Sequence, residues 1–236
     1  MTRGARLRLT LAMGLVFLTA CSNEPSRDGD FALARAVATA LATNIAPGLA
    51  GDGAPAQAAT DPQVVNALLE QLPPGPVIRI DVGGFQQSSF AIVAGTNPPY
   101  RTFVTFTGQS LTFRGGVVTS TRGFAFDLAS AQTGRAPELV STRGAGENNR
   151  VYRYLTPGDD EREFPVRCEI ASEGGDRVTL VSGRSFATTR MRETCQAGPF
   201  TFNNFYWVAS GGRVVKSQQW LSRELGMLTV EHLQED

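Results

Sequence analysis

Histidine, lysine and cysteine are all scarce in this sequence of 236 residues. His232 is the only histidine, so a metal site built on a histidine cluster is excluded, and a catalytic triad would have to use this one residue. Its place in a strand-like segment near the C-terminus favours a structural role instead. We therefore predict no metal site and no cofactor.

Lysine occurs once, at Lys216, and the other 21 of the 22 basic residues are arginines spread along the chain. These basic residues are balanced by 22 acidic ones. A nucleic-acid partner would require a concentrated basic face, which the sequence does not have. We predict that the chain binds no nucleic acid.

The sequence also lacks an uninterrupted apolar run of the ~20 residues that a bilayer-spanning helix needs. The apolar run 9–18 is shorter, and it follows a start that carries Arg3, Arg6 and Arg8. A charged start, a short apolar core and small residues after it are typical of a secretory signal. We predict that residues 1–20 are a signal peptide that is removed.

A cysteine follows this signal directly, in the order Leu18-Thr19-Ala20-Cys21. This order is that of a bacterial lipobox. There the cysteine becomes the new N-terminus and carries lipids, among which we expect palmitate. We predict that Cys21 holds the chain to a membrane and that residues 21–29 are a tether. In lipoproteins, an aspartate directly after the lipidated cysteine commonly retains the protein at the inner membrane. Ser22 occupies that position here, which favours the outer membrane, with the protein on its periplasmic face. The alternative is an ordinary secretory signal with a chance cysteine.

Only two cysteines remain after Cys21, namely Cys168 and Cys195. An even pair outside the cytoplasm predicts a disulfide, which would stabilise the fold by ~3 to 4 kcal/mol in the chain-entropy model. The alternative is a pair of free or metal-binding thiols. That reading is weaker because the spacing is long and histidine is scarce.

The mature chain reads as one domain whose apolar periodicity changes once. In segment 30–75 apolar residues recur at helical spacing, which predicts two short helices, at 30–47 and at 61–72, packed on the body. From residue 76 to the end the apolar period becomes two, and turn residues divide the chain into short runs. We predict a mostly β fold, an antiparallel sandwich or a barrel-like single domain.

Local signals divide the β segment further. Gly115-Gly116 and Gly211-Gly212 predict tight hairpins, because glycine takes positive φ without steric strain. Turns are predicted at 157–160 and 173–176. Residues 126–131 predict a short turn of helix, and residues 143–149 a glycine-rich loop.

Two blocks of the sequence resemble the YjbF family, the group 4 capsule polysaccharide lipoproteins. One block holds Tyr206-Trp207-Val208, the stretch 211–220 and Leu225-Gly226, and the other holds the stretch 116–123 with Asp127-Leu128. The resemblance implies an outer-membrane lipoprotein of mostly β fold. It also implies partners among the envelope proteins that make or export capsule or exopolysaccharide.

Aromatic and basic residues of the same block are candidates for contact with a polysaccharide or a protein partner: Tyr206, Trp207, Arg213, Lys216 and Trp220. Neighbours in a strand point to opposite faces, so a one-sided core cannot bury both Tyr206 and Trp207. The one that faces outward is the stronger candidate. Burial in the core is the alternative for each of these aromatics.

Carboxylates are the remaining catalytic candidates, since glycan cleavage needs two at a suitable separation. The main acidic cluster is Asp159, Asp160, Glu161 and Glu163. A predicted turn lies beside it, which indicates that these residues belong to a solvated loop. Asp81 and Asp127 lie near apolar strands. We predict a non-catalytic accessory in capsule or exopolysaccharide production, with no catalytic residues. The alternatives are a periplasmic enzyme that modifies or cleaves glycans and a general envelope scaffold.

Overall fold

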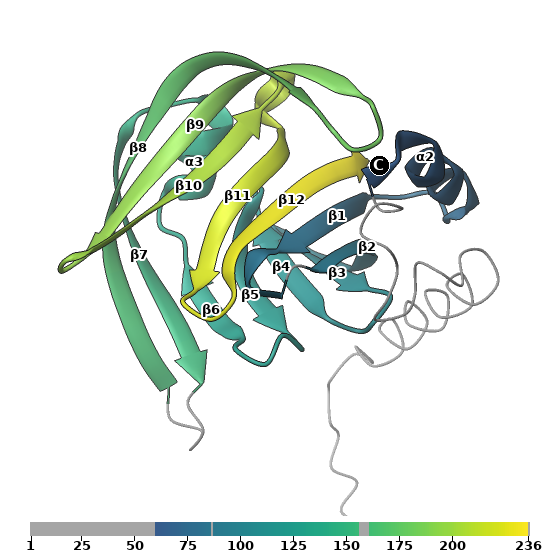
Figure 1. Cartoon of the computed structure of the whole chain (residues 1–236). Helices are drawn as coiled ribbons and strands as arrows, with labels where there is room; N and C mark the ends of the chain where they lie inside the picture. The colour runs from purple at the N-terminus through teal and green to yellow at the C-terminus, as the bar shows by residue number, and fades with distance from the viewer. Residues whose placement is uncertain (1–59, 86, 156–160, 236) are drawn as a thin grey trace, which may run out of the picture.

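The computed structural model describes residues 60–85, 87–155 and 161–235, and its chain forms a nearly closed antiparallel barrel (Figure 1). The predicted signal peptide, Cys21, the tether, the helix at 30–47 and the turn at 157–160 lie outside the described residues. The described part of segment 30–75 holds the second predicted helix. The predicted mostly β fold is confirmed.

The elements follow one another along the chain with short connections. Their bounds are α2 Pro62–Gln71, β1 Val77–Val82, β2 Gln87–Asn97, β3 Tyr100–Thr105, β4 Ser110–Arg114, β5 Val117–Arg122, β6 Leu128–Gln132, α3 Ala136–Thr142, β7 Gly146–Leu155, β8 Glu161–Thr179, β9 Ser185–Ala197, β10 Phe200–Val208, β11 Val214–Ser222 and β12 Gly226–Gln234. Two short 3-10 turns, Gly83–Phe85 and Ser210–Gly212, lie between strands.

Almost every strand pairs with the strand next to it in sequence. The twelve strands form one sheet in the order β5-β4-β3-β2-β1-β12-β11-β10-β9-β8-β7-β6, so the one non-sequential pair is β1 with β12. Its two end strands, β5 and β6, lie against each other. There the Arg122 guanidinium donates to the carbonyls of Leu128 and Ala129, at 3.1 Å each. Side-chain hydrogen bonds thus join β5 and β6, between which no backbone ladder of hydrogen bonds forms.

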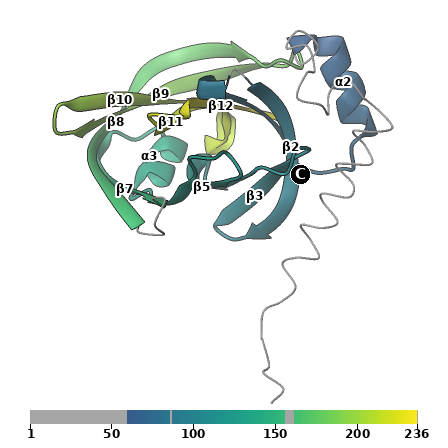
Figure 2. The ribbon, with the colours of Figure 1, turned by 60° about the horizontal axis from the view of Figure 1, so that its bottom comes forward.

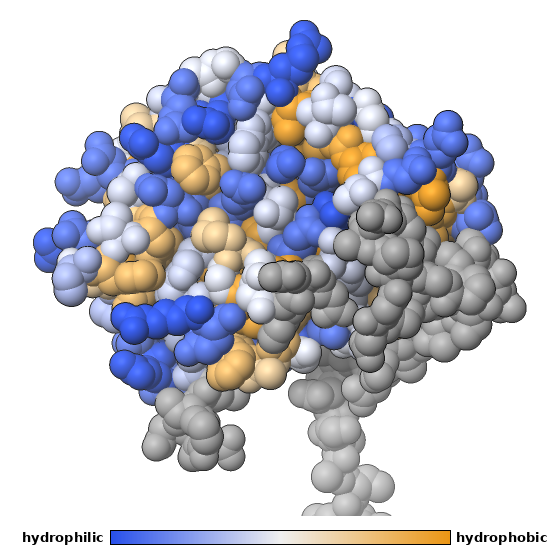
Figure 3. Space-filling view, in the orientation of Figure 1, coloured by the Kyte–Doolittle hydropathy of each residue, from blue (hydrophilic) through white to orange (hydrophobic). Residues whose placement is uncertain are grey.

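Helix α2 covers the outer face of the barrel, as its sequence predicts. The Asp61 carboxylate caps it by accepting a hydrogen bond from the backbone N–H of Gln63 at 2.8 Å. Its buried residues pack on apolar side chains of β1 and β12 and of the β8–β9 hairpin tip, among them Leu180. Apolar surface gathers between α2 and that tip, with charged side chains around it (Figure 3).

Helix α3 lies inside the ring of strands near one end of the barrel (Figure 2). Its Leu139 and Val140 pack against inward-facing side chains that include Val117, Met191 and Val208. We call this the plugged end. At the opposite end lie the end of β7, the start of β8 and the β11–β12 turn, with no helix among the described residues there, and we call it the open end.

Three local predictions are wrong, and in each case strand pairing overrides the local signal. Residues 126–131 are not helical, because Leu128 is fully buried and β6 pairs with β7. Residues 146–149 begin β7 rather than a loop. The predicted turn at 173–176 is part of β8, and a bulge between Ser172 and Gly174 accommodates its glycines.

Candidate functional site

A cavity of about 680 Å³ lies at the open end of the barrel. The β5–β6 loop, the end of β7, the start of β8 and the β11–β12 turn form its walls. We call it the open-end cleft, and its lining residues are Ala125, Phe126, Asp127, Tyr154, Arg162, Phe164, Trp220, Ser222, Arg223 and Glu224. A cavity of this size is within the range of ligand pockets.

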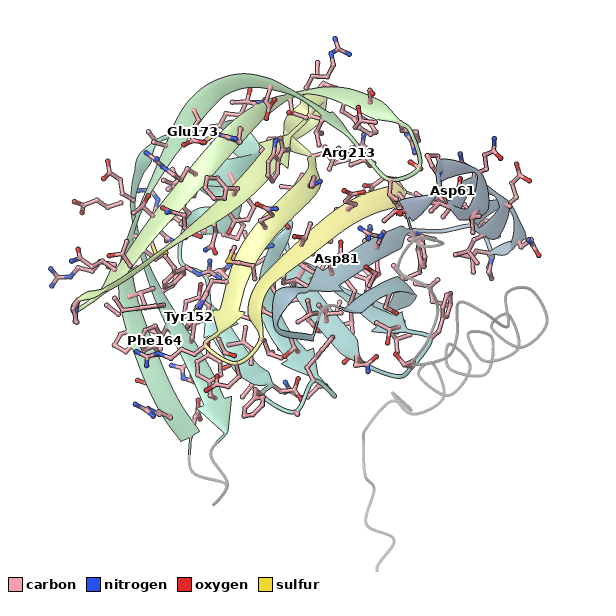
Figure 4. All side chains as sticks on the ribbon, in the orientation of Figure 1. Asp61, Asp81, Tyr152, Phe164, Glu173 and Arg213 are labelled. Carbon is pink, nitrogen blue, oxygen red and sulfur yellow. A yellow bond between two sulfur atoms is a disulfide. The ribbon has the colours of Figure 1, made fainter. Side chains whose placement is uncertain are left out.

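Aromatic rings form the floor of the cleft. The Trp220 ring lies 4.5 Å from the Phe202 ring, 5.5 Å from Phe200 and 5.7 Å from Phe164, measured between centroids. Trp220 itself is only 8% exposed, so its neighbours hold it in place. Phe164 and Tyr152 lie together in this part of the barrel (Figure 4). The floor is a rigid apolar surface of the kind on which a flat apolar group can stack.

The β5–β6 loop adds one exposed aromatic to this floor. Phe126 is 51% exposed. Among the described residues, the one other exposed large apolar side chain is Tyr100, at 40%. The preceding Ala125 has a positive φ of 68°, which is unfavourable for a residue with a Cβ. The Asp127 carboxylate holds this shape by accepting from the backbone N–H groups of Gly123, at 2.7 Å, and Phe124. The fold therefore maintains a strained turn that presents Phe126 to solvent.

Charged groups line the rim of the cleft. Arg162, Arg223 and Glu224 are exposed, and the Arg223 guanidinium lies 5.6 Å from the centre of the Phe200 ring. The Tyr154 hydroxyl donates inward to the carbonyl of Leu221, and burial raises its pKa well above the ordinary value. The cleft thus combines an apolar floor with exposed donors and acceptors around it.

A buried polar network lies deeper in the barrel and joins its strands. The Arg150 guanidinium pairs with the Glu193 carboxylate at 2.8 Å, and neither side chain is exposed. Glu193 also accepts hydrogen bonds from Asn148, Asn204 and the Tyr206 hydroxyl, at 3.1, 2.8 and 3.0 Å. These groups belong to β7, β9 and β10, so the network is a structural tie. Burial raises the pKa of the neighbouring Tyr152 to about 12, which keeps it neutral.

The sequence gives only an indirect signal of this network. Asn148, Arg150 and Tyr152 alternate along one face of β7, and that face points into the barrel. Alternation alone assigns polar residues to the solvent face, so the sequence prediction missed them. A partner for the Arg150 charge becomes visible only when β9 is placed beside β8.

The five predicted contact residues do not form one site. Trp220 lies in the open-end cleft, whereas Tyr206 is fully buried and hydrogen-bonded to Glu193, which removes it as a surface contact. Trp207 points to the outer face, opposite to Tyr206, as strand alternation requires. Lys216 lies beside it there, 5.9 Å from the centre of the Trp207 ring.

Both outer-face residues have partners within the chain. The Trp207 indole donates to Asp176 at 2.8 Å, and the Lys216 ammonium pairs with Glu231 at 2.8 Å. Arg213, the fifth candidate, lies at the plugged end (Figure 4). Only Trp220 of the five therefore belongs to the cleft.

The carboxylates considered for catalysis are dispersed. Asp159 and Asp160 lie outside the described residues, and Glu161 and Glu163 are exposed on β8, paired with Arg153 at 2.9 and 2.8 Å. Asp81 pairs with Arg79 on β1. Asp127 lines the cleft, but both of its oxygens hold the β5–β6 loop.

The predicted disulfide between Cys168 and Cys195 is present, and the two residues lie opposite each other in β8 and β9. Their sulfurs come within 4.8 Å of a Glu193 oxygen. This group does not suit a metal, because disulfide sulfurs are not thiolates. Within the described residues, no helix combines the length and apolarity that crossing a bilayer requires.

The solved structure of one lipoprotein agrees with this architecture. No curated protein matches the sequence. Among solved structures, the lipoprotein YmcC from Escherichia coli K12 superposes with a TM-score of 0.61 at 13% identity, covering 78% of this chain and 95% of YmcC. An exported protein with a YmcC-like fold from Bacteroides fragilis matches at 10% identity, covering 69% and 95% of the two chains, with a TM-score of 0.27.

The YmcC likeness supports the fold alone, because the identity is low. The family profile described as "Group 4 capsule polysaccharide lipoprotein gfcB, YjbF" matches residues 35–233, which is most of the chain. This match includes every described strand except the last residue of β12. The chain therefore belongs to the YjbF family of group 4 capsule polysaccharide lipoproteins.

Proposed function

We propose that this protein is a non-catalytic accessory of capsule or exopolysaccharide production that binds a stretch of the polysaccharide in the open-end cleft. The family description supports the link to capsule polysaccharide. The single observation that carries the binding site is Phe126, held 51% exposed over an aromatic floor by a strained loop.

The chemistry of the cleft suits a sugar chain. A pyranose ring has an apolar face of C–H groups that can pack on Phe126 and Phe164, and its hydroxyls both donate and accept hydrogen bonds. Arg162 and Arg223 on the rim supply donors, and Glu224 supplies an acceptor. A mostly apolar pocket with a few polar groups at its edge is the usual form of a ligand site.

A binding role accounts for the cleft better than glycan cleavage does. Cleavage needs an acid and a second carboxylate whose oxygens can reach the substrate. Of the two carboxylates that line the cleft, Asp127 uses its oxygens to accept from Thr121, Gly123 and Phe124. Glu224 is exposed on the β11–β12 turn. A glycan-modifying enzyme remains the alternative that the test below addresses.

The proposal extends to where the protein acts. A lipid on Cys21 would anchor it to the periplasmic face of the outer membrane, and the tether 21–29 would keep the barrel near that surface. At ~3.3 to 3.6 Å per residue, such a tether is short, which suits work beside export proteins embedded in the same membrane. A general envelope scaffold would use the same anchor without binding glycan, and crosslinking of partners in intact envelopes separates the two.

Tryptophan fluorescence tests the cleft directly, because the chain has two tryptophans in different places. In the full-length chain, Trp207→Phe leaves Trp220 as the only indole, at the cleft. We expect native polysaccharide fragments to change its fluorescence saturably. Phe126→Ala in this background should weaken binding about tenfold, as loss of a well-packed aromatic contact does.

Matched variants give the controls. Trp220→Phe leaves only Trp207, whose fluorescence should not respond, and Phe205→Ala removes an outer-face aromatic and should leave binding unchanged. An unresponsive Trp220, or equal losses from Phe126→Ala and Phe205→Ala, would refute the cleft. Shortening of the polysaccharide in the same mixtures would show an enzyme and contradict the non-catalytic role.

A further inference from the structure

A second cavity, of about 440 Å³, lies at the plugged end of the barrel, away from the open-end cleft. The β4–β5 hairpin, α3 and the ends of β3, β11 and β12 surround it. We call it the arginine pocket, and its ionisable lining residues are Arg101, Arg114, Glu138, Arg213, His232 and Glu235. The proposed function above makes no use of this cavity.

Three arginines from separate strands converge on this pocket. Arg101 is the second residue of β3, Arg114 ends β4, and Arg213 precedes β11. The Arg213 guanidinium lies 3.6 Å from Glu235 and 5.4 Å from the centre of the Phe186 ring. The backbone of Arg114 pairs with Tyr100 and Val117, but its guanidinium makes no ion pair or hydrogen bond with a residue that the structure describes. Its charge is therefore available to a ligand.

The electrostatic state of His232 reports the charge of the pocket. Its side chain is 14% exposed, and its ring packs edge-on against Phe103 with centroids 6.3 Å apart. Burial and, to a smaller extent, the nearby Arg213 and Arg101 guanidiniums together lower the pKa of His232 to about 4. At neutral pH the histidine is uncharged, so it adds no charge to the arginines and glutamates that line the pocket.

Glycines allow the walls to approach one another. Gly116 has a φ of +82°, and a Cβ there would lie 2.7 Å from a Val214 methyl group. Gly212 has a φ of +81°, and a Cβ there would lie 2.6 Å from the carbonyl oxygen of Ser141 in α3. Both Gly-Gly turns therefore pack directly on their neighbours, which fixes the arginines around the cavity on rigid backbone.

We propose that the arginine pocket binds a carboxylate-bearing sugar, a hexuronate residue of the polysaccharide. A guanidinium matches a carboxylate with two parallel hydrogen bonds, and Arg114 lines the pocket with its guanidinium unpaired among the described residues. Glu138 and Glu235 accept hydrogen bonds from sugar hydroxyls, and Pro99 and Pro137 supply apolar wall. A phosphate has a higher charge and no hydroxyls of this kind, so both glutamates would oppose it.

This inference rests on the proposed function for the polymer, but it concerns a different cavity and has its own readout. His232 is the only histidine, so the ring of a histidine-labelled, untagged full-length chain in detergent gives a single set of NMR resonances. At pH 7 we expect millimolar galacturonate or glucuronate to shift these resonances saturably. Glucose at the same concentration should not.

Arg114→Gln should raise the dissociation constant for the uronate about tenfold, because a charge-assisted hydrogen bond is lost. The fold should tolerate this change, since the Arg114 side chain has no hydrogen-bond or ion-pair partner among the described residues. Arg114→Lys keeps the charge and should bind with intermediate strength. Arg167→Gln removes an exposed arginine of β8 that lines neither cavity, and it should leave uronate binding unchanged.

Three results would overturn the inference: equal shifts from glucose and uronate, tighter binding of inorganic phosphate than of uronate, or tighter binding of a short peptide through its C-terminal carboxylate. Trp220 fluorescence on the same samples separates the two proposals. If polysaccharide binds at Trp220 while no uronate shifts His232, the arginine pocket fails alone. If Trp220 also stays silent, the proposed function fails as well.

Discussion

At the scale of single residues, the buried charge pair of Arg150 and Glu193 is the least replaceable feature. Both side chains are fully buried, and Glu193 accepts from four donors on β7 and β10. Glu193→Gln keeps the shape but leaves the Arg150 charge without a counterion. We expect this variant to lose ~3 to 5 kcal/mol of unfolding free energy, measured by urea denaturation.

A paired apolar replacement provides the control for that loss. Arg150→Met combined with Glu193→Leu removes both charges, so the remaining cost should be smaller than that of Glu193→Gln alone. If the double variant is as unstable as the single one, the charge pair is not what stabilises this part of the barrel.

His232 predicts a pH dependence of stability. Its pKa is about 4 in the folded protein, below the ordinary 6.5, so the unfolded chain binds the extra proton between these values. Its contribution is complete above pH 6.5 and decreases as the pH falls towards 4, by at most ~3 kcal/mol. Urea denaturation of the wild type and of His232→Gln across pH 4 to 7 measures it.

The His232→Gln variant isolates this contribution from the carboxylates, which also titrate at low pH. The difference in unfolding free energy between the two proteins should shrink as the pH falls. A difference that stays constant over the whole range would mean that the histidine does not titrate with a lowered pKa.

At the residue scale, the sequence predicts alternation but not which face meets a core. The sequence correctly predicts that Tyr206 and Trp207 lie on opposite faces of β10. Both faces, however, contact other groups: Tyr206 contacts the interior network, and Trp207 contacts Asp176 and Lys216. Phe126 carries no sequence signal at all. Its exposure depends on a turn held by Asp127, which becomes evident only in three dimensions.

At the scale of elements, the two Gly-Gly turns differ in what their glycines do. Gly116 needs both a positive φ of +82° and the space beside Val214, whereas Gly211 has a φ of +74° and open space around its missing Cβ. Gly211→Ala should therefore lose ~1 kcal/mol from backbone strain alone.

Gly116→Ala adds a steric clash to the same strain and should lose ~1 to 3 kcal/mol more. Thermal denaturation of the two variants side by side measures the difference. Equal losses would mean that the β4–β5 turn does not pack on β11 as described.

The disulfide ties β8 to β9 across a separation of 27 residues. In the chain-entropy model a loop of this length contributes ~3 to 4 kcal/mol, so Cys168→Ala with Cys195→Ala should lose about that much. Urea denaturation of the oxidised wild type and the variant measures the loss. Unchanged stability would show that the ladder between the two strands suffices without the bond.

The elements that the sequence predicts best have strong local determinants. The Asp61-Pro62 cap, the two-residue period and the Gly-Gly turns all give elements where expected. Helix α3 has weaker determinants: Pro137 and Glu138 lie in its first turn, but Arg135 offers no capping side-chain bond, and Arg143, not glycine, ends it at a φ of 57°. Its seven residues are stabilised by burial of Leu139 and Val140 inside the barrel, which a sequence cannot display.

At the scale of the whole molecule, sequential pairing of strands and one junction between β1 and β12 make a barrel whose two ends differ. Helix α3 fills one end and leaves the arginine pocket beside it, while the other end opens as the aromatic cleft. Secondary-structure patterns predict the strands but not which ends are plugged. The barrel thus has two separate cavities, one at each end.

We propose that the open-end cleft serves polysaccharide production. The most direct measurement is the amount of surface polysaccharide in a strain that lacks this gene, complemented with the full-length wild type, Phe126→Ala or Phe205→Ala at equal protein levels. We predict that the deletion lowers the amount, that the wild type and Phe205→Ala restore it, and that Phe126→Ala does not. Normal polysaccharide in the deletion strain, or full restoration by Phe126→Ala, would contradict the account.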